Sequence, residues 1–166
     1  KNQTIDKFLD SIGLTSHFIK EYNILIYYID ATPECVFDKL TCSKDIVNYF
    51  PLRDVISDWE VGSEVLYKGE LDGQAFTDFG VIECLDRPLQ YRYVYWSDNH
   101  GTERTPENHL SISYRLSSCG KGTRLNLEQG NIQSEDMFTI MDTVVWEALL
   151  DNMKIYIEKE FQDSVD

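Results

Sequence analysis

Residues 89–96 read Leu-Gln-Tyr-Arg-Tyr-Val-Tyr-Trp, and this stretch decides the fold class. Its alternate positions carry Leu89, Tyr91, Tyr93 and Tyr95. In a β-strand, alternate side chains point to the same side and follow one another at about 6.6 Å. We therefore expect a strand whose inner side is a row of mostly phenol rings, and whose outer side carries Gln90 and Arg92.

The same alternation extends in both directions from this strand, between residues 54 and 131. Six segments alternate or nearly so: VISDW, SEVLYKGEL, QAFTDFGVIECL, LQYRYVYW, HLSISYRLSS and TRLNLEQGN. Turn residues separate them at Val61-Gly62, Asp72-Gly73, Asp86-Arg87-Pro88 and Cys119-Gly120-Lys121-Gly122. Sequential strands with short connections predict an antiparallel meander. The longer link at residues 97–108 is polar and predicts a surface loop.

One strand and two short helices are predicted before the meander. Residues 21–30, EYNILIYYID, are rich in β-forming residues. Thr32 as a cap and Pro33 in the first turn predict the start of a helix. A second helix is expected with Ser43 as its cap, and Pro51 prevents it from continuing. A further amphipathic helix is predicted for residues 4–14.

A long helix is predicted at the C-terminal end, from Ser134 as a cap to about Phe161. Its length of roughly 40 Å would cross the whole sheet. Its apolar residues at helical spacing are Phe138, Met141, Val145, Ala148, Leu149 and Tyr156. Two polar residues interrupt this stripe, Asn152 near its centre and Asp142 toward its edge.

The order of elements and several motifs resemble the START/Bet v 1-like superfamily, and most of all the domain homologous to the activator of the Hsp90 ATPase. The motifs are Ile29–Leu40 (IDATPECVFDKL), Tyr49-Phe50, Trp59-x-Val61-Gly62, Asp72-Gly73, Gly80–Glu83, Pro88-Leu89, Gly122–Leu127 and Trp146. The resemblance spans about residues 22–160. It implies an α+β helix-grip fold, in which a curved antiparallel sheet of about seven strands surrounds a long C-terminal helix, with two short helices after the first strand. Residues 1–20 would form an N-terminal extension, and residues 21–166 a single domain.

The inner face of the sheet is the candidate functional region. Buried phenols need hydrogen-bond partners, which Phe or Leu would not. Each tyrosine alone fits a core position with its hydroxyl at the rim or on the backbone, but the cluster favours a cavity. The predicted ligand-binding residues are Phe50, Tyr67, Phe76, Asp78, Tyr91, Tyr93, Tyr95, Ile112, Tyr114, Leu125, Met141, Asp142, Val145, Trp146 and Leu149.

A catalytic set does not emerge from the sequence. Asp142 is the one candidate acid or base, and a position leaning to solvent is the alternative for it. The chain has three histidines, and their spacing to Cys, Asp or Glu is not that of a metal site. His100, Glu103 and Glu107 are better explained by a solvated loop. Since GxSxG, P-loop and GxGxxG motifs are also lacking, we expect no metal and no cofactor.

The charge and the cysteines limit the partners. With 15 Lys and Arg against 29 Asp and Glu, the net charge is −14, which argues against binding nucleic acid. No apolar run reaches the length of about 18 residues that a membrane-spanning helix needs, so we expect no membrane insertion. Cys35, Cys42, Cys84 and Cys119 are widely spaced, which favours buried free thiols and a cytoplasmic location.

Three functions remain open at this point. The first is a module that binds a small, largely apolar molecule between sheet and helix. The second, implied by the resemblance, is a domain that interacts with a chaperone. The third is a cyclase- or hydrolase-like enzyme that uses the same cavity, with Asp142 or a tyrosine hydroxyl as its acid or base.

Overall fold

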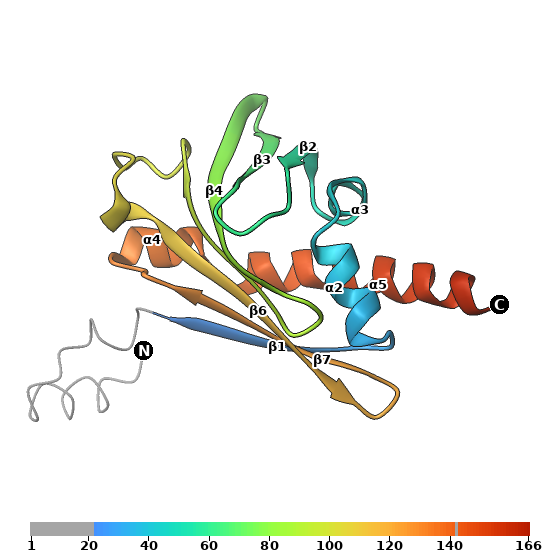
Figure 1. Ribbon diagram of the computed structural model, residues 1–166. Coiled ribbons are helices and arrows are strands. Elements are labelled where there is room, and N and C mark those ends of the chain that lie inside the picture. The colour runs from blue at the N-terminus through green and yellow to red at the C-terminus, as the bar shows by residue number, and fades with distance from the viewer. Residues whose placement is uncertain (1–21, 142) are drawn as a thin grey trace, which may run out of the picture.

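The structure is a computed structural model and describes residues 22–141 and 143–166 (Figure 1). The helix predicted for residues 4–14 lies outside the described residues, and so does Asp142. The elements are β1 (Asn23–Ile29), α2 (Pro33–Leu40), α3 (Ser43–Tyr49), β2 (Leu52–Ser57), β3 (Glu64–Leu71), β4 (Gln74–Asp86), β5 (Gln90–Ser97), the 3-10 helix η2 (Pro106–Asn108), β6 (Leu110–Cys119), β7 (Gly122–Gly130), α4 (Glu135–Ile140) and α5 (Thr143–Val165).

The seven strands form one antiparallel sheet in the order β1-β7-β6-β5-β4-β3-β2. The meander from β2 to β7 is consecutive, and β1 joins it beside β7, with Ile29 opposite Thr123. Helices α2, α3 and α5 pack on one face of this sheet, and α5 runs along it as the longest helix (Figure 1). The predicted helix-grip fold is confirmed.

The hairpin between β3 and β4 shows how local sequence sets the register. Asp72 and Gly73 both have positive φ, 50° and 78°. Two consecutive positive φ values define the tight turn whose twist matches that of paired strands, and Asp-Gly is a preferred pair for it. The turn lies between Leu71 and Gln74, which are the last paired residues of the hairpin. This register places Asp78 of β4 opposite Tyr67 of β3.

Two of the three predicted caps are confirmed. The Thr32 hydroxyl accepts a hydrogen bond from the Cys35 amide, at 3.3 Å, and the Ser134 hydroxyl accepts one from the Met137 amide, at 3.1 Å. Ser43 is different, because it is the first residue of α3 and Cys42 holds the cap position without a side-chain hydrogen bond. The Ser43 hydroxyl instead accepts a hydrogen bond from the Trp59 indole at 3.1 Å.

The long C-terminal helix is confirmed as α5, but its predicted start at Ser134 is wrong. The chain forms two helices, with Met141 in a non-helical conformation at the end of α4. The break resets the helical phase, so the residues of α5 that face the sheet differ from the predicted stripe. Leu150, Met153 and Ile157 are buried, whereas Val145 is 56% exposed. Ala148 and Asn152 are exposed as well.

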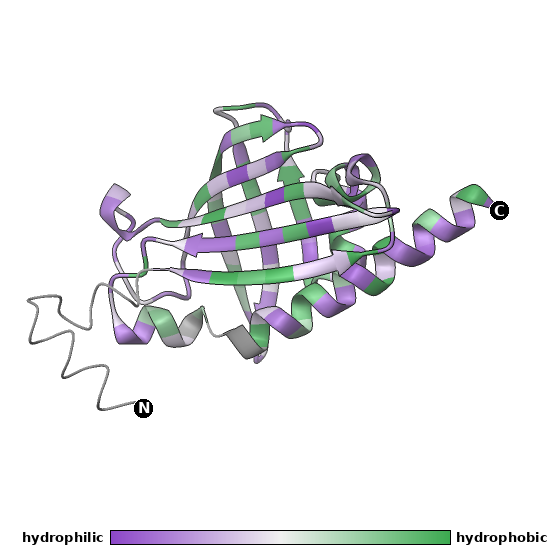
Figure 2. Ribbon diagram, turned by 90° about the horizontal axis from the view of Figure 1, so that it is seen from below, coloured by the Kyte–Doolittle hydropathy of each residue, from purple (hydrophilic) through white to green (hydrophobic). Residues whose placement is uncertain are grey.

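The inner face of the sheet follows the predicted alternation, which Figure 2 shows as alternating hydrophobic and hydrophilic bands along the strands. Buried inward residues include Val65, Tyr67, Tyr91, Tyr93, Tyr95, Leu110, Ile112, Tyr114, Leu116, Thr123, Leu125 and Leu127. Leu89 is the exception at 53% exposure, because it lies in the turn before β5 and not in the strand.

The link at residues 97–108 is not uniformly at the surface. Ser97 is fully buried and His100 is 9% exposed. The ring of His100 lies against the Tyr95 ring, with 5.5 Å between their centroids. Burial lowers the pKa of His100 from its ordinary value. This part of the link is therefore an extension of the core.

Two further features were predicted from the sequence, namely the absence of a membrane-spanning helix and the state of the four cysteines. None of the described helices combines the length and the apolar character of a membrane span. The four cysteines carry free thiols. Cys119 is exposed and the other three are half-buried, so the predicted full burial is wrong.

Candidate functional site

A small hollow opens between the sheet and α5, and we call it the aromatic pocket. Its volume is about 150 Å³. The lining residues are Phe50, Pro51, Leu52, Tyr67, Phe76, Asp78, Tyr93, Tyr95, Trp146 and Leu149. Pro51 is the one exposed residue of this set, and the others are buried or half-buried. The pocket thus presents six aromatic side chains and one carboxyl group.

Strand β4 brings Phe76 and Asp78 into the pocket, because residues two apart on a strand share a face. The neighbouring strand leaves room for the Phe76 ring. A Cβ atom on Gly69 of β3 would lie 2.6 Å from Cζ of Phe76, which is closer than two carbon atoms can approach. Glycine at this position therefore allows Phe76 to lie over β3 as a wall of the pocket.

Strand β5 supplies Tyr93 and Tyr95. The Tyr95 hydroxyl donates a hydrogen bond to the sulfur of Met141, at 3.3 Å. The Tyr93 ring lies between its neighbours, with centroids 5.5 Å from Tyr67 and 5.9 Å from Tyr95. Tyr93 also lines the pocket, and its hydroxyl makes no hydrogen bond to another described residue.

The remaining walls come from helices and from the link between α3 and β2. Trp146 and Leu149 extend from α5, and Phe50, Pro51 and Leu52 lie where α3 passes into β2. The rings of Phe50 and Trp146 meet edge to face, with 6.4 Å between their centroids. This contact ties the α3–β2 link to α5 across the pocket.

Asp78 is the charged group of the pocket. Its pKa is raised from 3.8 to about 6, because burial raises it most, a hydrogen bond with Ser97 lowers it, and the nearby charge of Asp98 raises it. Ser97 also donates a hydrogen bond to the Asn99 side chain, at 2.8 Å, so its hydroxyl is shared. Burial likewise raises the pKa values of Tyr67, Tyr93 and Tyr95 well above 10, and the three phenols stay neutral.

Eight predicted site residues line the aromatic pocket: Phe50, Tyr67, Phe76, Asp78, Tyr93, Tyr95, Trp146 and Leu149. Sequence reasoning missed Pro51 and Leu52, although their position directly after Phe50 was a usable signal. Val145 points away from the pocket, because the break before α5 changes the helical phase. Asp142 lies outside the described residues.

The structure places five other predicted residues outside the aromatic pocket and inside the packed core: Tyr91, Ile112, Tyr114, Leu125 and Met141. Their exposure does not exceed 2%. Helices α2 and α3 fill that end of the inner face with Phe37, Leu40, Ile46 and Tyr49. The aromatic pocket lies at the end of the inner face formed by β2 to β5.

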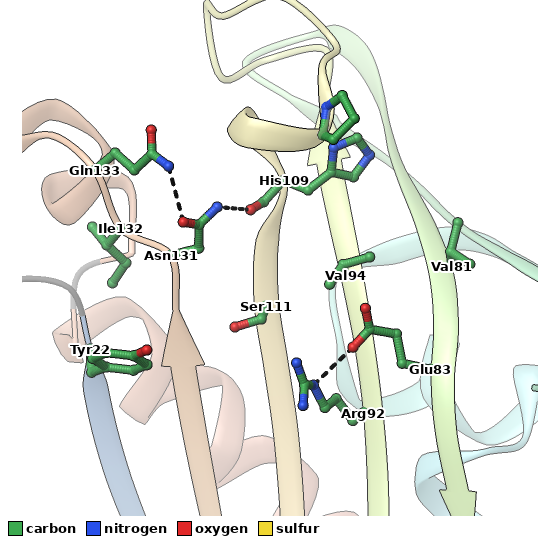
Figure 3. Close-up of a pocket in the computed structure, with 11 residues that line it drawn as sticks. Tyr22, Val81, Glu83, Arg92, Val94, His109, Ser111, Asn131, Ile132 and Gln133 are labelled. Atoms are coloured by element: carbon green, nitrogen blue, oxygen red, sulfur yellow. Dashed lines mark hydrogen bonds and ion pairs between the residues drawn. The ribbon is translucent and has the colours of Figure 1, made fainter. Parts of the chain in front are cut away.

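A larger groove of about 780 Å³ lies on the outer face of the sheet (Figure 3). Arg92 of β5 and Glu83 of β4 form an ion pair there, at 3.0 Å, and Asn131 donates a hydrogen bond to the His109 carbonyl, at 2.6 Å. Most of the lining residues are exposed: Tyr22, Val81, Glu83, Arg92, Pro106, Asn131 and Gln133. Because most of these residues are exposed and the charged groups Arg92 and Glu83 pair with each other, the groove is a weaker candidate than the aromatic pocket.

Metal ligands do not gather in the described ranges 22–141 and 143–166, where no three His, Cys, Asp or Glu side chains are placed to hold an ion. Glu107 and His109 lie near the outer groove, and the His109 Nδ1 is 2.6 Å from the Thr105 carbonyl.

Comparisons with known proteins agree on the architecture. Residues 30–158 match the sequence model of the family described as Activator of Hsp90 ATPase homolog 1-like protein. A search of curated proteins found no match. Protein ChR145 from Cytophaga hutchinsonii is similar in structure, with a TM-score of 0.69, 27% identity, and coverage of 84% of this chain and 94% of that one.

Two further solved structures extend this likeness. CalU16 from Micromonospora echinospora has a TM-score of 0.63 and 25% identity, with coverage of 86% of this chain and 79% of that one. The Aha1 dimer from Colwellia psychrerythraea has a TM-score of 0.65 and 18% identity, with coverage of 82% and 96%. The latter likeness concerns the fold alone.

Proposed function

Because the chain belongs to the Activator of Hsp90 ATPase homolog 1-like family and its structure has a hollow between sheet and helix, we propose that it binds a small, largely apolar molecule in the aromatic pocket. The observation that carries this proposal is the set of six aromatic side chains that line the pocket together with one half-buried carboxyl group. Ligand sites are typically apolar concavities with a few polar groups that orient the ligand.

The volume limits the size of the ligand. A cavity of about 150 Å³ in another protein, lined by apolar side chains, binds benzene. The aromatic pocket has the same volume, so a molecule of about one ring fits it. Typical pockets for drug-sized ligands are about 300–1,000 Å³. A long acyl chain therefore exceeds the space between Phe76 and Trp146.

Protein-detected NMR titrations with a library of single-ring and small branched compounds test the proposal. We expect binding that shifts the resonances of Tyr93 and Trp146. The variant Leu149→Trp places a larger side chain in the pocket, and we expect it to weaken binding at least about tenfold. Ile155→Trp on the exposed side of α5 is the matched control. A library without binders, or equal loss in both variants, contradicts the proposal.

A second candidate function is an interaction with an Hsp90-type chaperone, as the family description implies. The specific observation is an exposed apolar row on the outer side of edge strand β1 and the residue before it. The row consists of Tyr22, Ile24, Ile26 and Tyr28. Apolar residues gathered in this way on a surface mark interaction sites.

The chaperone candidate is tested with purified Hsp90. Binding and ATPase stimulation by this chain are compared with those of the variant Ile24→Ser/Ile26→Ser. Ile56→Ser, at an exposed position of β2, is the control. Loss in the β1 variant alone supports the candidate. Absence of binding by the unaltered chain contradicts it and leaves the pocket proposal unaffected.

A further inference from the structure

Asp78 is a half-buried acid that lines the aromatic pocket without a cationic partner. The ion pairs formed among the described residues do not include it. The lining of the aromatic pocket contains no Lys, Arg or His. The side chain of Asp78 is hydrogen-bonded to Ser97. The Ser97 hydroxyl also donates a hydrogen bond to the side-chain oxygen of Asn99. A buried carboxylate without a positive partner is costly, so proteins normally pair it.

The side chains that line the pocket around Asp78 are mostly aromatic, and aromatic rings attract positive charge. The π-faces of aromatic rings carry partial negative charge, and cations held over them are stabilised, most strongly where water is excluded. The pocket offers six such side chains: Phe50, Tyr67, Phe76, Tyr93, Tyr95 and Trp146. Aromatic walls of this kind are the usual recognition device for methylated ammonium groups.

We propose that the aromatic pocket binds a small organic cation, such as a methylated ammonium group, with the Asp78 carboxylate as its counter-ion. The inference rests on the proposed function and specifies the chemical class of the ligand. An ammonium carrying four carbon substituents is close to benzene in bulk, which suits a volume of about 150 Å³.

The charge of the whole chain favours the same ligand class. With a net charge of −14, the protein attracts cations and repels anions over its surface. A neutral apolar ligand would remove water from the Asp78 carboxylate without replacing the lost interactions. A cation restores them, and its alkyl groups contact the rings at the same time.

Isosteric probes separate charge from shape. Choline and 3,3-dimethyl-1-butanol have the same outline, but a carbon atom of the alcohol replaces the charged nitrogen. Their binding is measured by calorimetry at pH 7.5 and low salt. We expect choline to bind at least about tenfold more tightly than the alcohol. Equal affinity, or tighter binding of the alcohol, overturns the inference and leaves the proposed function standing.

Two variants assign the preference to Asp78. We expect Asp78→Asn to bring the affinities for choline and the alcohol within about twofold of each other. Asp72→Asn removes the same charge from the exposed β3–β4 turn and should keep the preference for choline. If Asp78→Asn keeps it too, the role of Asp78 is overturned. If neither probe nor any compound of the single-ring library binds, both this inference and the proposed function fail.

Discussion

The hydroxyl oxygens of Tyr67 and Tyr91 lie 2.8 Å apart, although β4 separates their strands. Tyr67 lines the aromatic pocket, whereas Tyr91 belongs to the packed core and stacks on Tyr93 and Tyr114. Their hydrogen bond therefore marks the boundary between the hollow and the filled parts of the inner face. Each phenol provides the other with the partner that burial requires.

Removing one hydroxyl of this pair should cost stability. In Tyr67→Phe the Tyr91 hydroxyl remains buried without its partner, and we expect a loss of about 1–3 kcal/mol in the free energy of unfolding. In Tyr67→Phe/Tyr91→Phe neither group needs a partner, so the double variant should be more stable than the sum of the single changes. Urea denaturation measures all four proteins, and strict additivity would contradict the pairing.

The raised pKa of Asp78 predicts a pH-dependent stability. In the folded protein Asp78 has a pKa of about 6, whereas the ordinary pKa of aspartate is 3.8. Protonated Asp78 therefore favours the folded state. This stabilisation is fully present below about pH 4 and is lost as the pH rises through about 6. Asp78→Asn should therefore exceed the unaltered protein in stability at pH 7.5, by up to about 3 kcal/mol, and lose this advantage near pH 4. Thermal melts across this range measure it, with Asp72→Asn as the charge control.

Cation binding should follow the opposite pH dependence. The carboxylate of Asp78 is the form that attracts a cation, so the affinity for choline should fall as the pH drops below about 6. Of the groups that face Asp78, Tyr67, Tyr93 and Tyr95 stay neutral in this range, and Asp98 lies at the end of β5. Calorimetric titrations at pH 7.5 and pH 5 compare the two states. An affinity independent of pH would exclude Asp78 as the counter-ion.

Gly69→Ala should alter the pocket through Phe76. The new methyl group overlaps the Phe76 ring, so the ring must move and the wall of the pocket with it. We expect weaker probe binding and a loss of about 1–3 kcal/mol in stability, as for other overpacked sites. Combining the change with Phe76→Leu removes the overlap and should recover part of the stability. A variant with unchanged binding and stability would show that the ring is not held there.

Two substitutions by alanine test which side of α5 faces the sheet. Leu150 is fully buried, and Leu150→Ala should cost about 2–5 kcal/mol in the free energy of unfolding. Val145 is exposed, and Val145→Ala should change stability by less than about 0.5 kcal/mol. Chemical denaturation of both variants distinguishes this phase from that of an unbroken helix, which would reverse the two results.

Much of the fold could be predicted because the strand signal is local. Tyr91, Tyr93 and Tyr95 occupy alternate positions, and their common face follows from strand geometry alone. Leu89 continues the same pattern in the sequence, yet it lies in the turn that precedes β5. Its side chain therefore does not join the inner face. Predicting this would require knowing that β5 begins at Gln90.

The extent of the pocket could not be predicted, because it depends on tertiary packing. Periodicity assigned Tyr93 to the inner face, and it does line the hollow. Asp78 was a candidate whose orientation the sequence left open, and it lines the hollow as well. Tyr114 and Leu125 share that face but lie under the short helices α2 and α3. Which end of the face these helices cover depends on contacts between distant segments, and no local pattern encodes it.

The pairing of β1 with β7 has a consequence for how the molecule is assembled. Ile29 and Thr123 are partners in the sheet and are separated by 123 − 29 = 94 positions in the chain. Contacts between such distant segments form late, since the entropy of closing the intervening loop must be overcome first. During synthesis on the ribosome, β1 therefore emerges long before β7, its strand partner in the described sheet. Its inward residues Leu25 and Ile29 remain uncovered until β7 has been made, which makes β1 a segment in need of protection from aggregation.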